Sequence, residues 1–479
     1  MSDGRGTGSS QRWEPVIGLE IHVQLKTRTK LFCRCEAGWG AEPNRRTCPV
    51  CLAHPGTLPV LNGRAIEWTI KLGLALGCRV AERAIFHRKH YFYPDLPKGY
   101  QISQYDEPLC VEGRVSVPGP AGDLEIGIVR AHLEEDAAKT VHVGGAGGRI
   151  GGAEHSLVDF NRGGTPLVEI VTRPDLHSAE DARRFLQLLR QTVIELGVSD
   201  AEMELGTLRV DANVSVRRAG EAALRTRTEI KNMNSFAFVG QGIQAEAERQ
   251  IGIWESGGEV VQQTFDFHAG SRTLTASRSK EEADDYRYLP EPDLVPVEPS
   301  RELVERLRAE LPELPGARIR RLEGAVGLEA AAGLVTGGRD RLFERVVAAG
   351  IEPRAVGNVL MNQFAGTGVD PEAVDAAELA RVIEARDRIP RSAFVEALAA
   401  SGDPGFSAGP YLADAAVSDA AELEPIVERV LAANEAQVAA FRAGKQGLLG
   451  FFVGQVMRET AGKANAKVVS ELVRSRLER

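Results

Sequence analysis

The sequence predicts an α+β protein, in which a strand-rich first part, residues 14–298, is followed by a part made of helices. Short segments of the first part alternate apolar and polar residues, the pattern of half-buried strands. Residues 290–299 then hold four prolines in ten positions, and such a run cannot continue a helix. Beyond it the chain is rich in Ala, Glu and Arg, with apolar residues at helical spacing. A largely antiparallel sheet is therefore expected first, and a helical region second.

The predicted strands of the first part come in groups that are close in the sequence, with only occasional helices between them. This favours a largely antiparallel sheet over a doubly wound parallel one. Two segments, 65–76 and 179–196, have apolar residues at helical spacing, and Ser178 with Asp181 three residues later predicts the start of the second helix. The segments predicted as strands are 16–25, 127–132, 156–160, 167–172, 207–216 and 227–231.

The second part contains three segments with helical periodicity, 301–309, 334–349 and 376–385. Residues 403–410, with two prolines and three glycines or serines, predict a second hinge before a small helical tail. We therefore expect these divisions of the chain: a disordered N-terminus at 1–13, the strand-rich domain at 14–298, a helical domain at 299–405 and the tail domain at 406–479.

Length and composition limit the class of protein. A chain of 479 residues is too long for one hydrophobic core and should form about two to four domains. Its hydrophobic content of 43% is ordinary for a globular protein, and no apolar run approaches the ~18 residues that span a bilayer. The net charge of −9 argues against a nonspecific coat for nucleic acid, so a nucleic-acid partner has to meet a local basic patch.

Four cysteines form two close pairs, Cys33 with Cys35 and Cys48 with Cys51, separated by twelve residues. This spacing suits a closed, tetrahedral zinc site with a structural role in the loop 33–51. The alternative is a pair of disulfides. Because the chain begins without an apolar signal segment, we expect a reducing cytoplasm as its location, and this favours metal binding.

A second candidate metal site begins at Glu20 and His22, which lie two residues apart in a predicted strand and so project from the same face. Taken alone, the pair is better explained as part of a solvated strand face. Other carboxylates, however, stand between apolar residues of predicted strands, where an isolated charge would be costly. Oxygen ligands with one imidazole favour Mg²⁺ or Mn²⁺ over zinc. These carboxylates are Glu169 and Asp211; Glu134 and Glu135 are further candidates, in a row of three acids that follows the predicted strand 127–132.

Basic residues gather at two places. Arg88 and Lys89 lie beside aromatic residues, an arrangement that suits a phosphate-bearing ligand. Taken alone, however, the segment is better explained as an ordinary aromatic-rich strand with basic flanks. The last stretch, 442–479, holds eight basic residues against three acidic ones. This excess is compatible with a solvated helix face or with contact to an RNA backbone.

Several motifs, in order along nearly the whole chain, closely resemble one family, the B subunits of the heterotrimeric aspartyl/glutamyl-tRNA amidotransferases. The motifs that carry the resemblance are 16–26, 55–62, 89–104, 132–136, 159–170, 208–215, 229–236, 285–294 and 462–467.

The resemblance implies a cradle-shaped catalytic domain related to the glutamine synthetase and guanidino kinase fold, then a helical domain and a tRNA-binding tail. It implies ATP-dependent amidation of Glu-tRNA(Gln), Asp-tRNA(Asn), or both. ATP and Mg²⁺ serve to phosphorylate the side-chain carboxylate, and ammonia arrives from glutamine hydrolysed in a separate amidase subunit. The implied partners are tRNA and the two other members of the heterotrimer, the amidase and one small subunit.

The resemblance also implies roles for individual residues. Catalysis and metal contact are expected of Glu20, His22, Glu135 and Asp211, with Glu134 and Glu169 as alternate ligands. Phosphate charge is expected to be balanced by Arg88, Lys89 and Lys231, and tRNA to be contacted by Lys445, Lys463 and Lys467. Zinc is expected to have a structural role, because the cysteine quartet occurs in only part of the family. Two other interpretations remain open: a noncatalytic tRNA-binding scaffold, and a free-standing amino-acid ligase without an RNA partner.

Overall fold

The computed structural model describes residues 12–145, 152–277, 286–413, 420–462 and 464–478. The chain divides into two compact units, residues 1–317 and 318–479, and each is described here by itself. Most of the N-terminal segment predicted to be disordered, and Lys463, lie outside the described residues.

The first unit is built on a nine-stranded sheet with the strand order β13-β12-β11-β10-β1-β9-β6-β5-β2. Each pair of neighbours is antiparallel except β11 and β12, so the predicted largely antiparallel sheet is confirmed. Its strands are β1 (Trp13–Gln24), β2 (Arg79–Val80), β5 (Cys110–Val117), β6 (Leu124–Glu135), β9 (Pro166–Thr172), β10 (Leu208–Arg218), β11 (Thr228–Lys231), β12 (Thr264–His268) and β13 (Thr273–Ala276).

The alternation of side chains along β1 gives the sheet one apolar and one polar face. Ile17, Leu19 and Ile21 are almost completely buried and belong to the core. Glu20 and His22 alternate with the apolar residues and face the other side, where they line a cavity. The same alternation in β10 buries Val210, Ala212 and Val214 on the core side.

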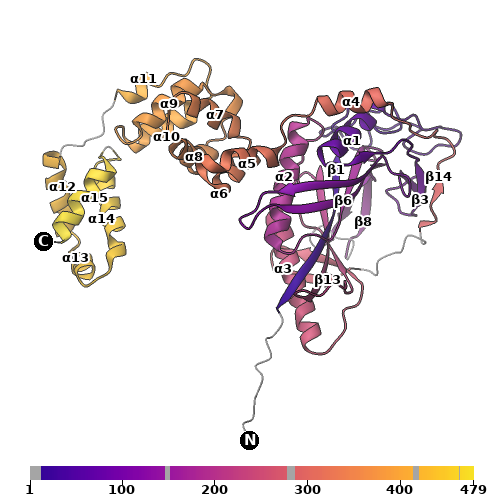
Figure 1. Ribbon diagram of the computed structural model, residues 1–479, viewed down its shortest axis with the longest axis horizontal. Helices are drawn as coiled ribbons and strands as arrows, with labels where there is room; N and C mark the ends of the chain where they lie inside the picture. Colours follow the sequence, from indigo (N-terminus) through magenta and orange to yellow (C-terminus); the bar gives the residue numbers. More distant parts are fainter. Residues whose placement is uncertain (1–11, 146–151, 278–285, 414–419, 463, 479) are drawn as a thin grey trace, which may run out of the picture. The chain divides into compact units, whose positions relative to one another are not determined.

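Helices cover the apolar face: α2 packs against α3, α3 packs against β10, and α1 packs against β5 and β6 (Figure 1). At each N-terminus a polar side chain accepts a hydrogen bond from a backbone N–H of the first turn and satisfies a donor that the helix leaves free. The accepting side chains are Asn62 for α1, Ser178 for α2 and Ser235 for α3. The cap predicted at Ser178 is confirmed. The bounds are α1 (Gly63–Ala75), α2 (Ala179–Glu195) and α3 (Phe236–Glu255).

Two smaller sheets complete the first unit. One has the order β14-β3-β4 and combines β14 (Leu289–Pro290), β3 (His87–His90) and β4 (Tyr100–Ser103). The other is the pair β7 (Lys139–Val143) and β8 (His155–Asp159). Helix α4 (Arg301–Ala309), which follows the proline-rich segment, packs against α1 inside this unit.

The described part of the second unit contains only helices. The single helix predicted over 334–349 is wrong: the structure has two helices, separated by Gly337 and Gly338. Gly338 has φ of +66°, a left-handed conformation that ends a helix readily and favours glycine. The α-helices are α5 (Pro315–Val326), α6 (Leu328–Thr336), α7 (Asp340–Ala348), α8 (Pro353–Asn362), α9 (Ala376–Ala385), α10 (Arg391–Ala400), α11 (Gly409–Leu412), α12 (Ala420–Ala432), α13 (Glu435–Arg442), α14 (Leu449–Glu459) and α15 (Ala466–Leu477).

The tail helices share a core of their own, with Leu423, Phe441, Phe452 and Val473 almost completely buried. Across the described residues of the whole chain, no helix is long and apolar enough to cross a membrane.

Candidate active site and thiolate cluster

The polar face of the nine-stranded sheet forms the floor of a cavity of about 760 Å³. Strands β1, β6, β9, β10 and β11 each contribute charged side chains to it, at alternate positions of each strand. The charged and imidazole side chains that line the cavity are Glu20, His22, Lys89, Asp95, Arg130, His132, Glu134, Asp136, Glu169, Arg209, Asp211, Arg227, Glu229 and Lys231.

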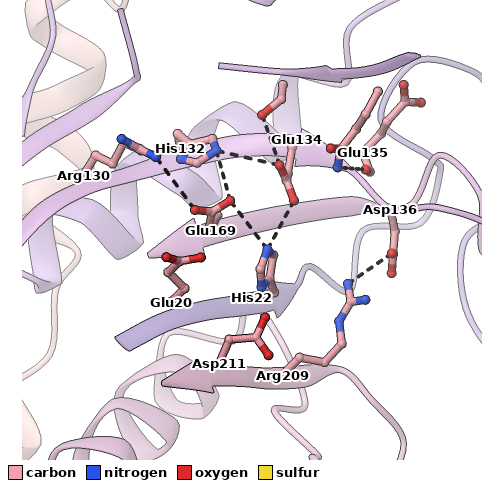
Figure 2. Close-up of polar contacts among 12 residues, drawn as sticks. Glu20, His22, Arg130, His132, Glu134, Glu135, Asp136, Glu169, Arg209 and Asp211 are labelled. Atoms are coloured by element: carbon pink, nitrogen blue, oxygen red, sulfur yellow. Dashed lines mark hydrogen bonds and ion pairs between the residues drawn. The ribbon is translucent and has the colours of Figure 1, made fainter. Parts of the chain in front are cut away.

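Two carboxylates and two imidazoles meet at the centre of this floor (Figure 2). His22 Nε2 lies 3.5 Å from an oxygen of Glu134 and 3.5 Å from an oxygen of Glu169. His132 Nε2 lies 3.8 Å and 3.6 Å from the same two carboxylates. Strand register explains the grouping, because His22 of β1 and His132 of β6 both pair with Glu169 of β9.

The electrostatics of the group favour charged side chains. Burial by itself would raise the pKa of Glu169, but His132, His22 and Lys89 hold that pKa well below its usual range. Burial would lower the pKa of His22, and contact with Glu169 and Glu134 raises it overall. The group is therefore a buried cluster of ionised carboxylates balanced by cationic neighbours.

Glu20 and Asp211 lie beside this cluster and are cross-strand partners in the register of β1 and β10. Glu20 Oε1 accepts a hydrogen bond from Asn213 Nδ2 at 2.9 Å. Asp211 Oδ2 accepts from Lys231 Nζ at 2.6 Å, and Glu229 lies 3.3 Å from the same ammonium. Burial would lower the pKa of Lys231, but Asp211 and Glu229 raise it, so the residue stays cationic.

Lys89 lines the cavity, and its expected role in balancing phosphate charge stays a prediction. Burial would lower its pKa, but the carboxylates of Glu134 and Glu169 raise it. Its ammonium also lies 4.6 Å from the centre of the Tyr286 ring.

Seven charged or imidazole residues that line the cavity were not assigned from the sequence: Asp95, Arg130, His132, Asp136, Arg209, Arg227 and Glu229. Three of them, Arg130, His132 and Arg209, lie on strands β6 and β10 of the floor. Arg209 donates to Asp136 Oδ1 at 3.1 Å, and Arg130 lies 3.9 Å from Glu169. A signal for them was present, because Arg209 shares its strand parity with Asp211, and Arg130 and His132 share theirs with Glu134. Extending the parity argument from Glu20 and His22 to each strand would have found all three.

Glu135, which the sequence analysis preferred to Glu134, does not line the cavity. Neighbouring residues of a strand point to opposite faces, so Glu134 joins the cluster and Glu135 faces away from it. Glu135 forms an ion pair with Lys98 and accepts from the backbone N–H of Ile102 at 2.9 Å. The structure thus reverses the predicted order of the two carboxylates.

Arg88, expected to balance phosphate charge, also lies outside the cavity lining. Its guanidinium donates to both oxygens of Glu291, at 2.8 Å and 2.7 Å, and to Asp293 at 3.3 Å. The two carboxylates already engage this side chain. Arg88 is therefore placed to hold a segment of the protein and not a phosphate.

The four cysteines of the loop 33–51 come together as predicted. Their sulfur atoms all lie within 4.8 Å of one another, and Cys48 Sγ and Cys51 Sγ are 3.9 Å apart. The fully buried Lys30 lies with Nζ 3.7 Å from Cys51 Sγ. The hydrogen bond from Cys33 lowers the pKa of Cys51 to about 4, and Lys30 acts in the same direction. Cys78 and Cys110 are buried elsewhere in the unit, as small apolar residues often are.

Both clusters fit a metal ion by the chemistry of their donor atoms. Four cysteine sulfurs within 4.8 Å of one another suit tetrahedral zinc, whose bonds of about 2.3 Å separate the sulfurs by about 3.8 Å. His22, Glu134 and Glu169 each offer one ligand atom within 4.8 Å of the others, and carboxylate oxygens with an imidazole suit a hard divalent ion.

Two of the three lysines predicted to contact tRNA are described in the structure. Lys445 and Lys467 are both exposed, the second in the first turn of α15 after the N-cap Asn465. Their roles stay predictions.

Comparison with known proteins covers almost the whole chain. Residues 15–305 match the family described as GatB/GatE catalytic domain, and residues 341–477 match the family described as GatB domain. Similar proteins include the aspartyl/glutamyl-tRNA(Asn/Gln) amidotransferase subunits B of Thermobifida fusca and Moorella thermoacetica. The first is 47% identical over 97% of this chain and 94% of its own length, the second 46% identical over 97% and 100%. The same protein of Syntrophotalea carbinolica is 44% identical over 98% of this chain and 99% of its own. The chain therefore belongs to the GatB family, the B subunits of the aspartyl/glutamyl-tRNA(Asn/Gln) amidotransferases.

Proposed function

We propose that this chain phosphorylates the side-chain carboxylate of Glu-tRNA(Gln), Asp-tRNA(Asn), or both, with ATP, so that ammonia can convert it to the amide. The observation that carries the proposal is the cluster of His22, Glu134 and Glu169 inside a cavity that also contains Lys89, Arg209 and Lys231. Ligands for a divalent ion and fixed cations thus share one cavity, as phosphoryl transfer requires.

The reaction needs activation because a carboxylate does not react with ammonia. In the first step a carboxylate oxygen attacks the γ-phosphorus of ATP, the bond to the bridging oxygen breaks, and ADP leaves. In the second, ammonia attacks the acyl carbon, phosphate leaves with the carboxylate oxygen, and a proton is lost from nitrogen. The products are the amide, ADP and phosphate, which is the balance of a carbon–nitrogen ligase.

His22, Glu134 and Glu169 are proposed to hold Mg²⁺, with Glu20 and Asp211 beside them. The ion, when bound, supplies positive charge against the charge of the phosphates. Lys89 and Arg209 line the same cavity and neutralise phosphate oxygens from the protein side. Lys231 already contacts Asp211 and Glu229, so its ammonium is oriented before a phosphate enters. Positioning and charge neutralisation are thereby assigned to fixed side chains.

The proposal includes partners. The chain contains no residue set that we assign to glutamine hydrolysis, so a separate amidase is proposed to supply ammonia, and one further small protein to complete a heterotrimer. The thiolate cluster is proposed to hold a structural zinc ion that fixes the loop 33–51. The exposed Lys445 and Lys467 are proposed to contact the tRNA backbone. The proposed location of the protein is a reducing cytoplasm.

Membership of the family favours this catalytic interpretation over a noncatalytic scaffold. A scaffold has no use for a buried group of two carboxylates and two imidazoles, whose assembly costs desolvation free energy.

The test is conversion of Glu-tRNA(Gln) and Asp-tRNA(Asn) to their amides by the chain with its candidate amidase and small partners, ATP, Mg²⁺ and glutamine. Amide formation that a folded Glu20→Ala variant loses supports the proposal, and the ratio of products gives the substrate preference. If neither tRNA is converted although the amidase partner hydrolyses glutamine, the proposal is wrong.

A further inference from the structure

Residues 286–297, here called the strap, form one wall of the cavity. Tyr286 and Tyr288 of the strap line it, and the next two residues form β14, which pairs with β3 through Leu289 and Arg88. Further along, the backbone N–H of Val297 donates to the oxygen of Ala84 at 2.8 Å. The pairing of β14 with β3 and this hydrogen bond anchor the wall within the first unit.

Arg88 contacts the strap through both oxygens of Glu291. Its Nε and terminal nitrogen donate to the two oxygens of Glu291 in a fork, and the Glu291 side chain is only 1% exposed. Such bidentate pairs fix geometry as well as charge. The guanidinium also lies 4.5 Å from the centre of the Tyr100 ring, which limits its movement on a second side. Arg88 thus has its orientation fixed and fixes Glu291 in turn.

Tyr105, Lys89 and His90 contact the strap beside the cavity. The Tyr288 ring stacks on Tyr105 with ring centres 4.2 Å apart and an angle of 9°. Tyr286 covers the ammonium of Lys89, the next residue after Arg88. His90 Nδ1 contacts the oxygen of Arg287 at 2.9 Å. Arg88 and His90 of β3 therefore hold the strap, while Lys89 between them faces the cavity.

We propose that Arg88 is a positioning residue, which holds the strap so that Tyr286 and Tyr288 form an aromatic wall for the adenine group of a substrate. The inference rests on the proposed function, because it concerns the substrates of that reaction. The inference goes beyond the proposed function because it assigns the adenine contact, and because it makes Arg88 a residue that positions the strap instead of one that binds phosphate.

The composition of the cavity supports an adenine ligand. Four of the seven tyrosines of the chain line it, the strap pair together with Tyr91 and Tyr105. Bases stack on aromatic rings with a gain of about 1–3 kcal/mol per base. Two substrates of the proposed reaction carry adenine, ATP and the terminal adenosine of tRNA, and the experiment distinguishes them.

The first arm of the test measures release of the strap without any activity. Arg287 is exposed and provides a tryptic site inside the strap. In the full-length chain, Arg88→Met is expected to accelerate cleavage after Arg287 by roughly tenfold or more, because proteolysis follows the population of the open form. The matched control is Arg83→Met, which breaks an exposed ion pair with Glu107. Equal cleavage in the two variants overturns the positioning role of Arg88.

The second arm measures KM for ATP and for the aminoacyl-tRNA in the reconstituted complex. Arg88→Met and Glu291→Gln are expected to raise one of the two KM values about tenfold, and Tyr288→Leu to raise the same one. Loss of folded protein by itself lowers kcat and leaves both KM values unchanged. The control Arg83→Met should also leave both KM values unchanged. Arg88→Lys, which keeps the charge but not the fork, serves if Arg88→Met does not fold.

The substrate whose KM rises is the one whose adenine meets the wall. If the strap is released and neither KM changes, the aromatic wall is wrong. An inactive wild-type complex contradicts the proposed function instead, and leaves the tryptic result to decide the role of Arg88.

Discussion

The two candidate metal sites of the first unit are assembled in opposite ways. The thiolate cluster comes from one loop, residues 33–51, and its four cysteines are half-buried. The cluster of His22, Glu134 and Glu169 comes from three strands, β1, β6 and β9, that are distant in the sequence and adjacent in the sheet. A local site can fold around its ion, whereas a site made by strand register exists only when the sheet has formed.

This difference suggests different uses. The loop cluster offers four thiolates and has no open position, which suits a structural ion. The sheet cluster lies in a large cavity beside fixed cations, where an ion can meet a substrate. The variants below are expected to affect chemistry at the sheet cluster and stability at the loop cluster.

The largest effect is expected from His22→Ala. Removal of the imidazole that contacts both Glu134 and Glu169 should lower amide formation by roughly 10²–10³-fold, since it unbalances the charges aimed at the phosphates. The measurement is the initial rate of amide formation, with the thermal unfolding midpoint recorded beside it. His177→Ala is the control, because His177 contacts the Pro15 backbone oxygen and does not line the cavity. Equal rates in the two variants would remove His22 from the site.

A sharper comparison uses two neighbouring carboxylates. Glu134→Gln should raise the Mg²⁺ concentration for half-maximal ATP cleavage by about tenfold or more, because it weakens a proposed ligand. Glu135→Gln should leave that concentration unchanged, since Glu135 faces Lys98 and Ile102. The measurement is a Mg²⁺ titration of tRNA-dependent ATP cleavage. A shift in the second variant and none in the first would mean that the strand alternation has been misassigned.

Loss of a cysteine from the thiolate cluster is expected to lower the stability of the protein. Cys48→Ser is expected to remove about one zinc ion per chain and lower the unfolding midpoint by roughly 5 °C, because the loop loses its ion. ATP cleavage per folded molecule should persist. Metal analysis, calorimetry and limited proteolysis of the loop 33–51 provide the readouts. Cys78→Ala, at a buried cysteine outside the cluster, should keep its zinc; loss of ATP cleavage without loss of stability in Cys48→Ser would argue against a structural ion.

The smallest effect is expected at the tail. Replacement of both Lys445 and Lys467 by Glu should raise the KM for tRNA about three- to tenfold and reduce its salt dependence, with kcat unchanged. The measurement is steady-state kinetics at several salt concentrations. Arg308→Glu makes the same kind of charge reversal at an exposed position of α4, in the first unit. If it weakens tRNA binding as much, the effect belongs to net charge and not to the tail.

Much of the sheet could be predicted from the sequence, because the alternation in β1, β9 and β10 is regular. The thiolate cluster could be predicted as well, since its ligands lie close together in the chain and sulfur spacing carries the signal. Helix α2 was predicted to within one residue, because Ser178 marks its start. Helix α3 was not predicted; its N-cap, Ser235, was part of a motif attributed only to the family resemblance.

The rest of the site depends on contacts that a single strand does not contain. Which of Glu134 and Glu135 faces the cavity follows from the parity of β6, and three adjacent acids in the sequence conceal that parity. Arg88 looked like a phosphate ligand until its partner Glu291, far away in the sequence, was seen. His132 had no assigned role because its neighbours, Glu169 and His22, come from other strands. Register and distant ion pairs are properties of the folded sheet.

The most direct measurement traps the acyl phosphate. The reconstituted complex is given Glu-tRNA(Gln) or Asp-tRNA(Asn), ATP, Mg²⁺ and hydroxylamine without glutamine, and the hydroxamate formed on the aminoacyl group is measured. We predict ATP-dependent hydroxamate with the wild-type chain and a loss of about 10²-fold with Glu169→Gln, which neutralises the carboxylate between His22 and His132. Hydroxamate at the wild-type rate in Glu169→Gln, with the protein folded, would contradict the claim that this face of the sheet is the phosphorylation site.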